Sequence, residues 1–270
     1  MIQISAIKKD RQEKPKMYID LNCDLAQSFG VYKNESEIEL LPYVTSVNIA
    51  CGSHAGDPLT IMNALKIASE KNLAVGAHIG YPDIQGFGYR PMQLTEEEIQ
   101  AIVTYQIGAL TSLAKLYHLE VDYVRPHGAL YRQAAEDFNV SLNIAKAIAK
   151  YNPWLIYVGA IGDNLAKAGE VANIRVAHEI LLDKTYNHDG SINFNAGDLT
   201  DKEAIFEQLN SIIRNGEVKN NNNGYTKVKF NTIHLGIKAD FSLELAQKAR
   251  ELVENPAPIA VSVVEDTSWI

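Results

Sequence analysis

The chain has 270 residues, of which 46% are hydrophobic and 21% charged, and its formal net charge is -8. This composition is typical of a globular protein with enough apolar residues for a sizeable core. The acidic balance excludes a nucleic-acid partner, since neutralising phosphates requires a surplus of Lys and Arg on one face. A membrane span is also excluded, because no segment approaches the ~18 apolar residues that crossing a bilayer requires.

The first sixteen residues differ from the remainder of the chain. They are rich in charge, aperiodic, and without the apolar centre of a secretory signal. We expect residues 1–16 to be a disordered leader before a single domain over residues 17–270, and Met17 is the alternative start. Cys23 and Cys51 lie in apolar segments and do not indicate a disulfide scaffold. These features together predict a cytoplasmic protein.

Apolar runs of strand length recur along the chain and alternate with helical patterns. The strands are expected at residues 18–25, 44–50, 73–79, 123–126, 154–159, 175–180 and 230–235. Amphipathic helices are expected in most of the gaps, including residues 141–150 and 242–253. The polar tract 220–224 is typical of a hairpin tip or an exposed loop.

Capping residues mark where three of these helices begin. Asp57 stands at an N-cap with Pro58 at the first helical position. Thr95 and Glu98 form the pattern of a capping box, which Thr200 and Glu203 repeat.

The alternation of strand and helix continues without a linker or a change of composition, which indicates one domain. It predicts a parallel sheet, either closed as a (β/α) barrel or open and doubly wound. An open dinucleotide-binding sheet would carry G-x-G-x-x-G after its first strand, and a phosphate loop would carry G-x-x-x-x-G-K-[ST]. Neither pattern occurs. We therefore predict an α/β fold, a single-domain, seven-stranded (β/α) TIM-like barrel.

Polar and titratable residues gather where the expected strands end. In a parallel barrel these ends meet at one mouth, where such barrels place their active sites. The mouth is predicted to include Asp20, Asn22, Asp24, Asn48, His54, Asp57, His78, Asp83, Arg125, His127, Glu179, Asp183 and His234. One histidine at a strand end is usually structural, but several with carboxylates on a shared face favour catalysis. Cys51 is interpreted as a small buried thiol rather than a nucleophile.

Five segments carry a resemblance to a known family. They are DLNCDLAQSFG, TSVNIACGSHAGDP, GAHIGYPDIQGFGYR, YQIGAL and VRPHGALY, which follow one another between Asp20 and Tyr131. In this order they resemble the signature segments of the LamB/YcsF family, and the similarity continues more weakly to Asp183 and His234.

The resemblance implies a barrel similar to those of glycoside hydrolases and metal-dependent deacetylases. It also implies a hydrolase that opens the lactam of 5-oxo-L-proline to L-glutamate, with ATP consumed, in a complex with two partner subunits, B and C. ATP would act through that complex, because this chain has no nucleotide-binding motif of its own. A small-molecule substrate is the other expected partner, and a homo-oligomer is left open.

The sequence departs from the family pattern at several positions. Ala26-Gln27 stands where the family usually has Gly-Glu, and His234-Leu235-Gly236 stands where it has His-Gly-Asp. Smaller departures are Ile79, Tyr89 and the pair Asp183-Lys184. Gln27 keeps the reach of a glutamate but cannot hold a negative charge or accept a proton at neutral pH.

Lactam hydrolysis requires a group that activates water, a donor for the developing oxyanion and an acid for the leaving nitrogen. Asp24 or His127 is expected to be the base, and Arg125 to stabilise the oxyanion or bind a substrate carboxylate. His54 or His78 is expected to be the acid. The expected substrate-binding residues are Asp20, Asn22, Asn48, His78, Glu179, Asp183 and His234.

Two alternatives remain open. Asp24, His54 and His78 would suit a divalent metal such as zinc, as in a stand-alone metal-dependent amide hydrolase or deacetylase that needs no ATP. The missing carboxylates instead favour a catalytically degenerate paralogue that serves as a binding subunit.

Overall fold

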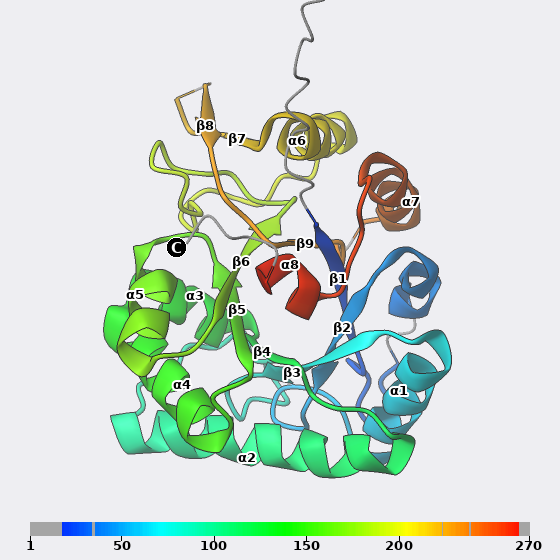
Figure 1. Ribbon diagram of the computed structural model, residues 1–270, viewed down its shortest axis with the longest axis vertical. Coiled ribbons are helices and arrows are strands. Elements are labelled where there is room, and N and C mark those ends of the chain that lie inside the picture. The colour runs from blue at the N-terminus through cyan, green and yellow to red at the C-terminus, as the bar shows by residue number, and fades with distance from the viewer. Residues whose placement is uncertain (1–17, 34–35, 223, 238, 265–270) are drawn as a thin grey trace, which may run out of the picture.

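The protein is described from a computed structural model, which defines residues 18–33, 36–222, 224–237 and 239–264 (Figure 1). The expected leader over residues 1–16, and Met17 as the alternative start, lie outside these described residues.

Seven parallel strands close into a barrel in the order β1, β2, β3, β4, β5, β6, β9. β9 pairs with both β1 and β6 and thereby closes the ring. The strands are β1 (Asp20–Leu25), β2 (Ser46–Ala50), β3 (Ala74–Ile79), β4 (Tyr123–Pro126), β5 (Ile156–Ala160), β6 (Val176–Leu181) and β9 (Thr232–His234). The predicted seven-stranded barrel is confirmed.

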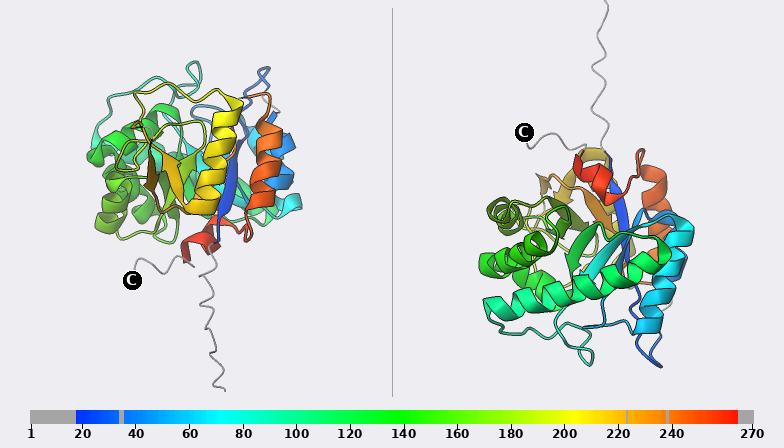
Figure 2. Two further views of the ribbon diagram at one scale, coloured as in Figure 1. Left: turned by 90° about the horizontal axis from the view of Figure 1, so that it is seen from above. Right: turned by 60° about the horizontal axis from the view of Figure 1, so that its bottom comes forward.

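Helices surround the barrel on its outer side (Figures 1 and 2). They are η1 (Ser36–Tyr43), α1 (Pro58–Lys71), α2 (Glu96–Ala114), η2 (Lys115–Tyr117), α3 (Gly128–Glu136), α4 (Phe138–Tyr151), α5 (Asp163–Ala172), α6 (Lys202–Asn215), α7 (Ser242–Leu252) and α8 (Ile259–Val264). Ile259 of α8 packs against Tyr123 and Ile156 at the amino-terminal ends of their strands, opposite the mouth. Within the described ranges, no helix is both long and apolar enough to cross a membrane.

The capping residues act as predicted at two of the three helix starts. Asp57 accepts a hydrogen bond from the Thr60 amide, and Thr95 with Glu98 forms the complete capping box of α2. The third prediction is wrong by one residue, because the side chain of Asp201, not Thr200, accepts a hydrogen bond from the Ala204 amide. Thr and Asp are both favoured N-cap residues, and here they are adjacent. The local pattern therefore could not distinguish Thr200 from Asp201 as the N-cap.

Two other boundaries depend on tertiary contacts. The fifth strand begins at Ile156 rather than Trp154, whose side chain is 77% exposed. β7 (Glu217–Lys219) and β8 (Tyr225–Lys227) form an antiparallel pair, so the described residues of the predicted tract, 220–222 and 224, lie at a hairpin tip.

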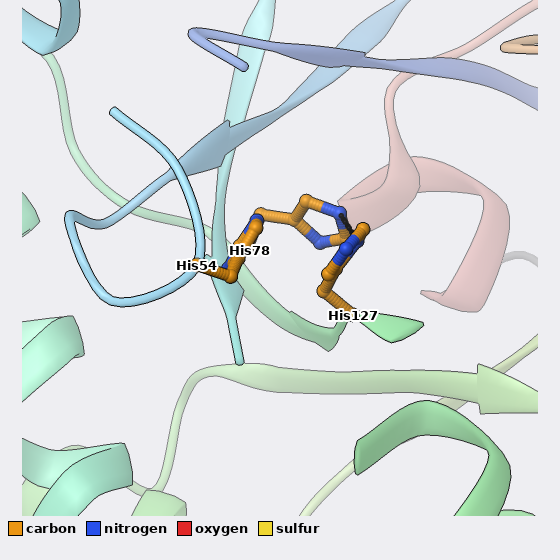
Figure 3. A group of neighbouring side chains, drawn as sticks. All are labelled: His54, His78 and His127. Carbon is orange, nitrogen blue, oxygen red and sulfur yellow. Dashed lines mark hydrogen bonds between the residues drawn. The ribbon is translucent and has the colours of Figure 1, made fainter. Parts of the chain in front are cut away.

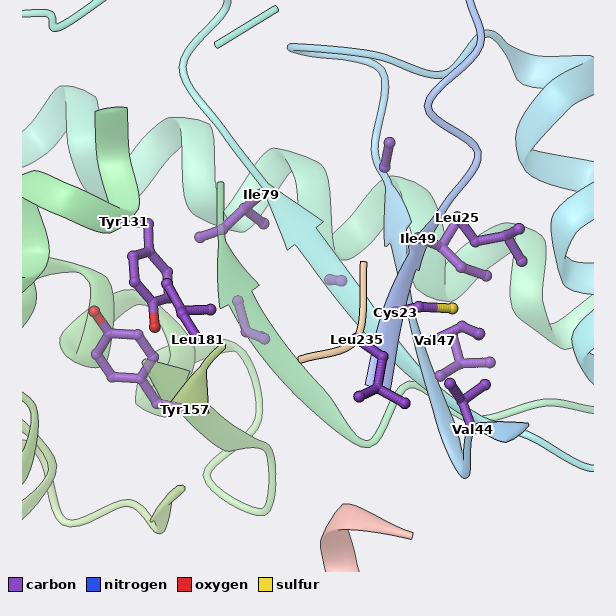
Figure 4. Packing of buried hydrophobic residues seen from close by; sticks show 14 of the residues in the cluster. Cys23, Leu25, Val44, Val47, Ile49, Ile79, Tyr131, Tyr157, Leu181 and Leu235 are labelled. Carbon is purple, nitrogen blue, oxygen red and sulfur yellow. The ribbon is translucent and has the colours of Figure 1, made fainter. Parts of the chain in front are cut away.

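The hydrophobic core lies between the barrel and its helices. Along β1, Leu21, Cys23 and Leu25 belong to this core, whereas the residues that alternate with them are polar. Figure 4 shows Leu25 beside Ile49 and Cys23 beside Val47, the residues of β2 with which they pair. Because side chains on a strand alternate between its faces, the polar set points into the barrel. The interior of this barrel is therefore polar along β1, and it leads to the mouth.

Candidate active site

The lower level of the barrel interior is built around Asp20, near the amino-terminal end of β1. Its carboxylate accepts hydrogen bonds from Thr45 Oγ1 (2.8 Å), Ser46 Oγ (2.8 Å) and Thr232 Oγ1. Burial outweighs these donors and raises the pKa of Asp20 to about 6. Asp20 is thus enclosed by neutral hydroxyl groups.

Asp24 lies one level higher, at the mouth. Its Oδ1 accepts hydrogen bonds from Asn48 Nδ2 (2.9 Å) and Arg125 Nη1 (3.3 Å), and lies 3.4 Å from His78 Nε2. Burial alone would raise the pKa of Asp24, but its interactions with His78, His234 and Arg125 hold it well below its usual range. The carboxylate is therefore ionised at neutral pH.

A left-handed turn after β1 places Gln27 against Asp24. Ala26 has a φ of 63°, a region that costs a residue with a Cβ atom about 1–2 kcal/mol. Gln27 Nε2 then donates to Asp24 Oδ2 at 2.7 Å. A donor to a carboxylate favours its charged form, so Gln27 stabilises ionised Asp24.

Arg125 and Glu179 form a buried ion pair across the mouth. Arg125 Nε lies 2.8 Å and 2.9 Å from the two carboxylate oxygens of Glu179, and its guanidinium lies over the ring of Tyr131 at 5.2 Å. Burial would raise the pKa of Glu179, but Arg125 lowers it. The ionised carboxylates of Asp24 and Glu179 therefore share one guanidinium.

A chain of hydrogen bonds joins this ion pair to the remaining strands. Tyr123 donates to Asn48 Oδ1 (2.8 Å), and Asn48 Nδ2 donates to Asn22 Oδ1 (2.8 Å). His234 Nδ1 also donates to Asn22 Oδ1 (2.8 Å), and Asn22 Nδ2 donates to Glu179 Oε1 (3.1 Å). The amides therefore hold the charged groups in fixed positions.

Three histidines meet at one side of the mouth (Figure 3). His54 lies in the loop after β2, His78 on β3, and His127 directly after β4. The rings of His54 and His127 stack with centroids 4.0 Å apart, and His78 packs edge-on against both. Burial lowers the pKa of His54 well below its usual range and that of His127 to about 3. Both rings are neutral at physiological pH.

Two glycines provide the space for these rings. A Cβ atom on Gly80 would lie 2.5 Å from His54 Nδ1, and one on Gly88 would lie 2.8 Å from His127 Cδ2. Gly88 also has a φ of +71°, in the left-handed region that favours glycine. A larger residue at either position would displace a histidine.

The turn between β2 and α1 holds two polar residues, His54 and Asp57, that have different functions. Gly52 has a φ of +88°, and its amide donates to the Ala55 carbonyl at 2.8 Å, which directs His54 into the mouth. Asp57 instead accepts hydrogen bonds from the amides of Thr60 (2.9 Å) and Gly30 (3.0 Å). Asp57 therefore stabilises the turn and the helix start.

The structure brings most of the predicted site residues into one connected group. These are Asn22, Asp24, Asn48, His54, His78, Arg125, His127, Glu179 and His234. Asp20 lies below them, and Asp183 pairs with Lys184 (2.9 Å) in the segment after β6. Cys51 is buried as predicted, and burial raises the pKa of its thiol to about 12, which disfavours the nucleophilic thiolate.

Sequence reasoning missed three members of the site. Tyr123 and Thr232 hold the two asparagine side chains, and Tyr131 lies against Arg125. Period-two alternation could have found Thr232, because it precedes His234 by two residues on the same face of β9. Tyr131 follows His127 by four residues in α3, which is one helical turn.

Comparisons with known proteins agree with this geometry. The model of the LamB/YcsF family matches residues 19–266. The chain is 41% identical over 243 residues to the 5-oxoprolinase A subunit of Acinetobacter baumannii, covering 88% of this chain and 96% of that one. It is 39% identical over 251 residues to the 5-oxoprolinase A subunit of Bacillus subtilis, covering 92% and 97%.

A solved structure extends the similarity to the fold. The crystal structure of the lactam utilization protein from Thermus thermophilus superposes with a TM-score of 0.82 at 33% identity, covering 90% of this chain and 100% of that one. The sequence relatives, the family model and the barrel therefore agree, and the chain belongs to the LamB/YcsF family.

Proposed function

We propose that this chain is the A subunit of an ATP-dependent 5-oxoprolinase, a hydrolase that opens the lactam of 5-oxo-L-proline to L-glutamate with partner subunits B and C. The names of the relatives support the activity and a multi-subunit enzyme. The name of the Thermus protein supports a lactam as the substrate class. We place the reaction in the cytoplasm.

One feature of the site carries the proposal: an ionised carboxylate, Asp24, lies beside neutral imidazoles and a fixed guanidinium. A neutral imidazole can accept a proton from the attacking water and return it to the leaving nitrogen. His54, whose ring nitrogens make no hydrogen bond within the described residues, has this role. Arg125 stabilises negative charge that develops on the lactam oxygen, and Asp24 holds the Arg125 guanidinium in place.

ATP is assigned to the partner subunits because the sequence of this chain has no phosphate loop. An unstrained amide is a poor electrophile, so its activation is assigned to the partner subunits, which bind the nucleotide. This chain then provides the acid and base groups.

The test is reconstitution with the B and C subunits of the same cell. The complex should release glutamate from 5-oxoproline with phosphate from ATP in a fixed ratio, and the isolated chain should release none. A complex that consumes ATP but forms no glutamate would contradict the proposal.

A second candidate is a stand-alone, metal-dependent amide hydrolase, which the cluster of three histidines favours. A bound divalent ion would polarise the amide carbonyl and lower the pKa of water. This candidate predicts glutamate from the isolated chain without ATP. Turnover under those conditions would select it over the first.

A further inference from the structure

The hydrogen bonds of His78 and His127 determine where each ring carries its proton. His78 Nδ1 lies 3.1 Å from the Arg125 carbonyl oxygen, and His127 Nε2 lies 2.8 Å from the Phe87 carbonyl oxygen. A carbonyl oxygen only accepts, so the proton resides on these two nitrogens. In the neutral rings, His78 Nε2 and His127 Nδ1 therefore carry lone pairs.

These two lone pairs face each other. His127 Nδ1 and His78 Nε2 are 3.1 Å apart, which is a hydrogen-bond distance between two atoms that both accept. Such an approach is favourable when a cation lies between the nitrogens. Two imidazole ligands of a tetrahedral zinc ion lie roughly 3.3 Å apart, given Zn–N distances of about 2.0–2.1 Å. Imidazoles that bind metals usually donate their other N–H to a carbonyl, as both rings do here.

His54 provides an independent observation. His54 is 1% exposed, and among the residues that the structure describes neither of its ring nitrogens has a hydrogen-bond partner. A buried polar group without a partner carries a substantial desolvation cost, so its retention indicates a ligand. One nitrogen from each of His54, His78 and His127 lies within 4.8 Å of the others.

The charges around the cluster also favour a cation. Asp24 and Glu179 contribute two negative charges, and Arg125, which pairs with both, contributes one positive charge. A net negative charge therefore remains beside neutral nitrogen donors.

We propose that His54, His78 and His127 bind one divalent cation of the zinc class through His78 Nε2, His127 Nδ1 and one nitrogen of His54. Imidazole donors favour zinc, cobalt or nickel over magnesium or calcium, which prefer oxygen. The set differs from the one expected from the sequence, since His127 takes the place of Asp24. Asp24 remains beside the ion, where Gln27, Asn48 and Arg125 hold its oxygens.

The test measures binding of the metal alone, so its outcome does not depend on the proposed activity. The chain is stripped with a chelator and titrated with Zn²⁺ by calorimetry and with Co²⁺ by visible absorption. One equivalent should bind, with the spectrum of a low-coordinate nitrogen site. His127→Ala and His54→Ala should each lose more than the roughly 10–100-fold in affinity that removal of an outer partner costs. His188→Ala, at an exposed histidine, is the matched control and should bind as wild type.

Two further variants keep the test decisive. Asp24→Asn should retain the cobalt spectrum, and a spectrum lost in Asp24→Asn but kept in His127→Ala would overturn the proposed ligand set. His127→Gln, which keeps much of the volume, replaces His127→Ala if the latter melts early. The metal site itself would be overturned if the folded wild-type chain bound no zinc. In that case, nitrogen chemical shifts should show a proton shared between His78 and His127.

Discussion

Two aspartates on β1 occupy neighbouring levels of the same barrel and have opposite electrostatic properties. Asp20 and Asp24 are both buried, yet the pKa of Asp20 is raised to about 6 and that of Asp24 is held well below its usual range. The difference lies in their partners. Hydroxyl groups surround Asp20, whereas Arg125 and imidazole rings surround Asp24.

This comparison shows that burial and hydrogen bonding do not by themselves preserve a buried charge. Neutral donors offset only part of the desolvation cost at Asp20, while His78, His234 and Arg125 together reverse it at Asp24. The lower level is therefore arranged for packing, and the upper level maintains a carboxylate for chemistry.

The largest effect is expected when the negative charge of Asp24 is removed. Asp24→Asn should lower turnover of the reconstituted complex by about 10²–10⁴-fold, because Arg125 loses a carboxylate that positions it and the imidazoles lose the negative charge beside them. Asp20→Asn is the matched control and should keep turnover close to wild type. Steady-state assays of both folded variants provide the measurement. If both variants lost turnover equally, Asp20 would belong to the substrate site, and its role would not differ from that of Asp24.

The second prediction concerns stability against pH. The pKa of Asp20 rises from 3.8 unfolded to about 6 folded, so the folded chain binds more protons and loses stability as pH rises through that window. The loss is ~3 kcal/mol in the free energy of unfolding at about 1.4 kcal/mol per pKa unit. Denaturant melts from about pH 4 to 7 should show this slope in the difference between wild type and Asp20→Asn. At Asp24 the sign is opposite, and its stabilisation should disappear only as pH falls below about 4. A flat difference for Asp20→Asn would contradict the assignment.

The third prediction concerns a new carboxylate placed directly against Asp24. In Gln27→Glu the new group would lie against Asp24 Oδ2, which now accepts the Gln27 amide at 2.7 Å. Like charges at this distance raise a pKa, so the acidic limb of the pH–rate profile should move to higher pH. Gln27→Ala, which removes the donor without adding a charge, should move it less. Higher turnover at neutral pH in Gln27→Glu would instead support the interpretation of this chain as a degenerate paralogue.

The smallest effect is expected outside both levels, at Asp57. Asp57→Ala should lower the free energy of unfolding by about 0.5–2 kcal/mol through loss of the helix cap. Turnover should change little, because Asp57 hydrogen-bonds the turn and not the histidines. The pKa of Asp57 is lowered to about 2 by its backbone donors, so the difference from wild type should shrink as pH falls toward 2. Urea melts at neutral pH and near the lowered pKa check both statements.

Local sequence patterns are sufficient to locate most of the helices and strands and to predict the barrel. The alternation of DLNCDL, the cap at Asp57 and the capping box at Thr95 are set by neighbours within four residues, and the structure agrees at each. The same short range explains why the N-cap of α6 was predicted at Thr200. Thr200 and Asp201 are adjacent capping residues, and the position of α6 in the folded protein selects Asp201.

The partners and the charge state of each polar residue depend on contacts that form only in the folded barrel. Asp20 and Asp24 share a strand, a face and a residue type, but Asp24 meets Arg125 and Asp20 meets Thr232, both more than a hundred residues away. The pairing of His78 with His127 likewise depends on carbonyl groups that no side-chain motif encodes. Strand periodicity fixes which side of the sheet a residue faces, whereas its depth in the closed barrel fixes its partners, and those partners set its charge.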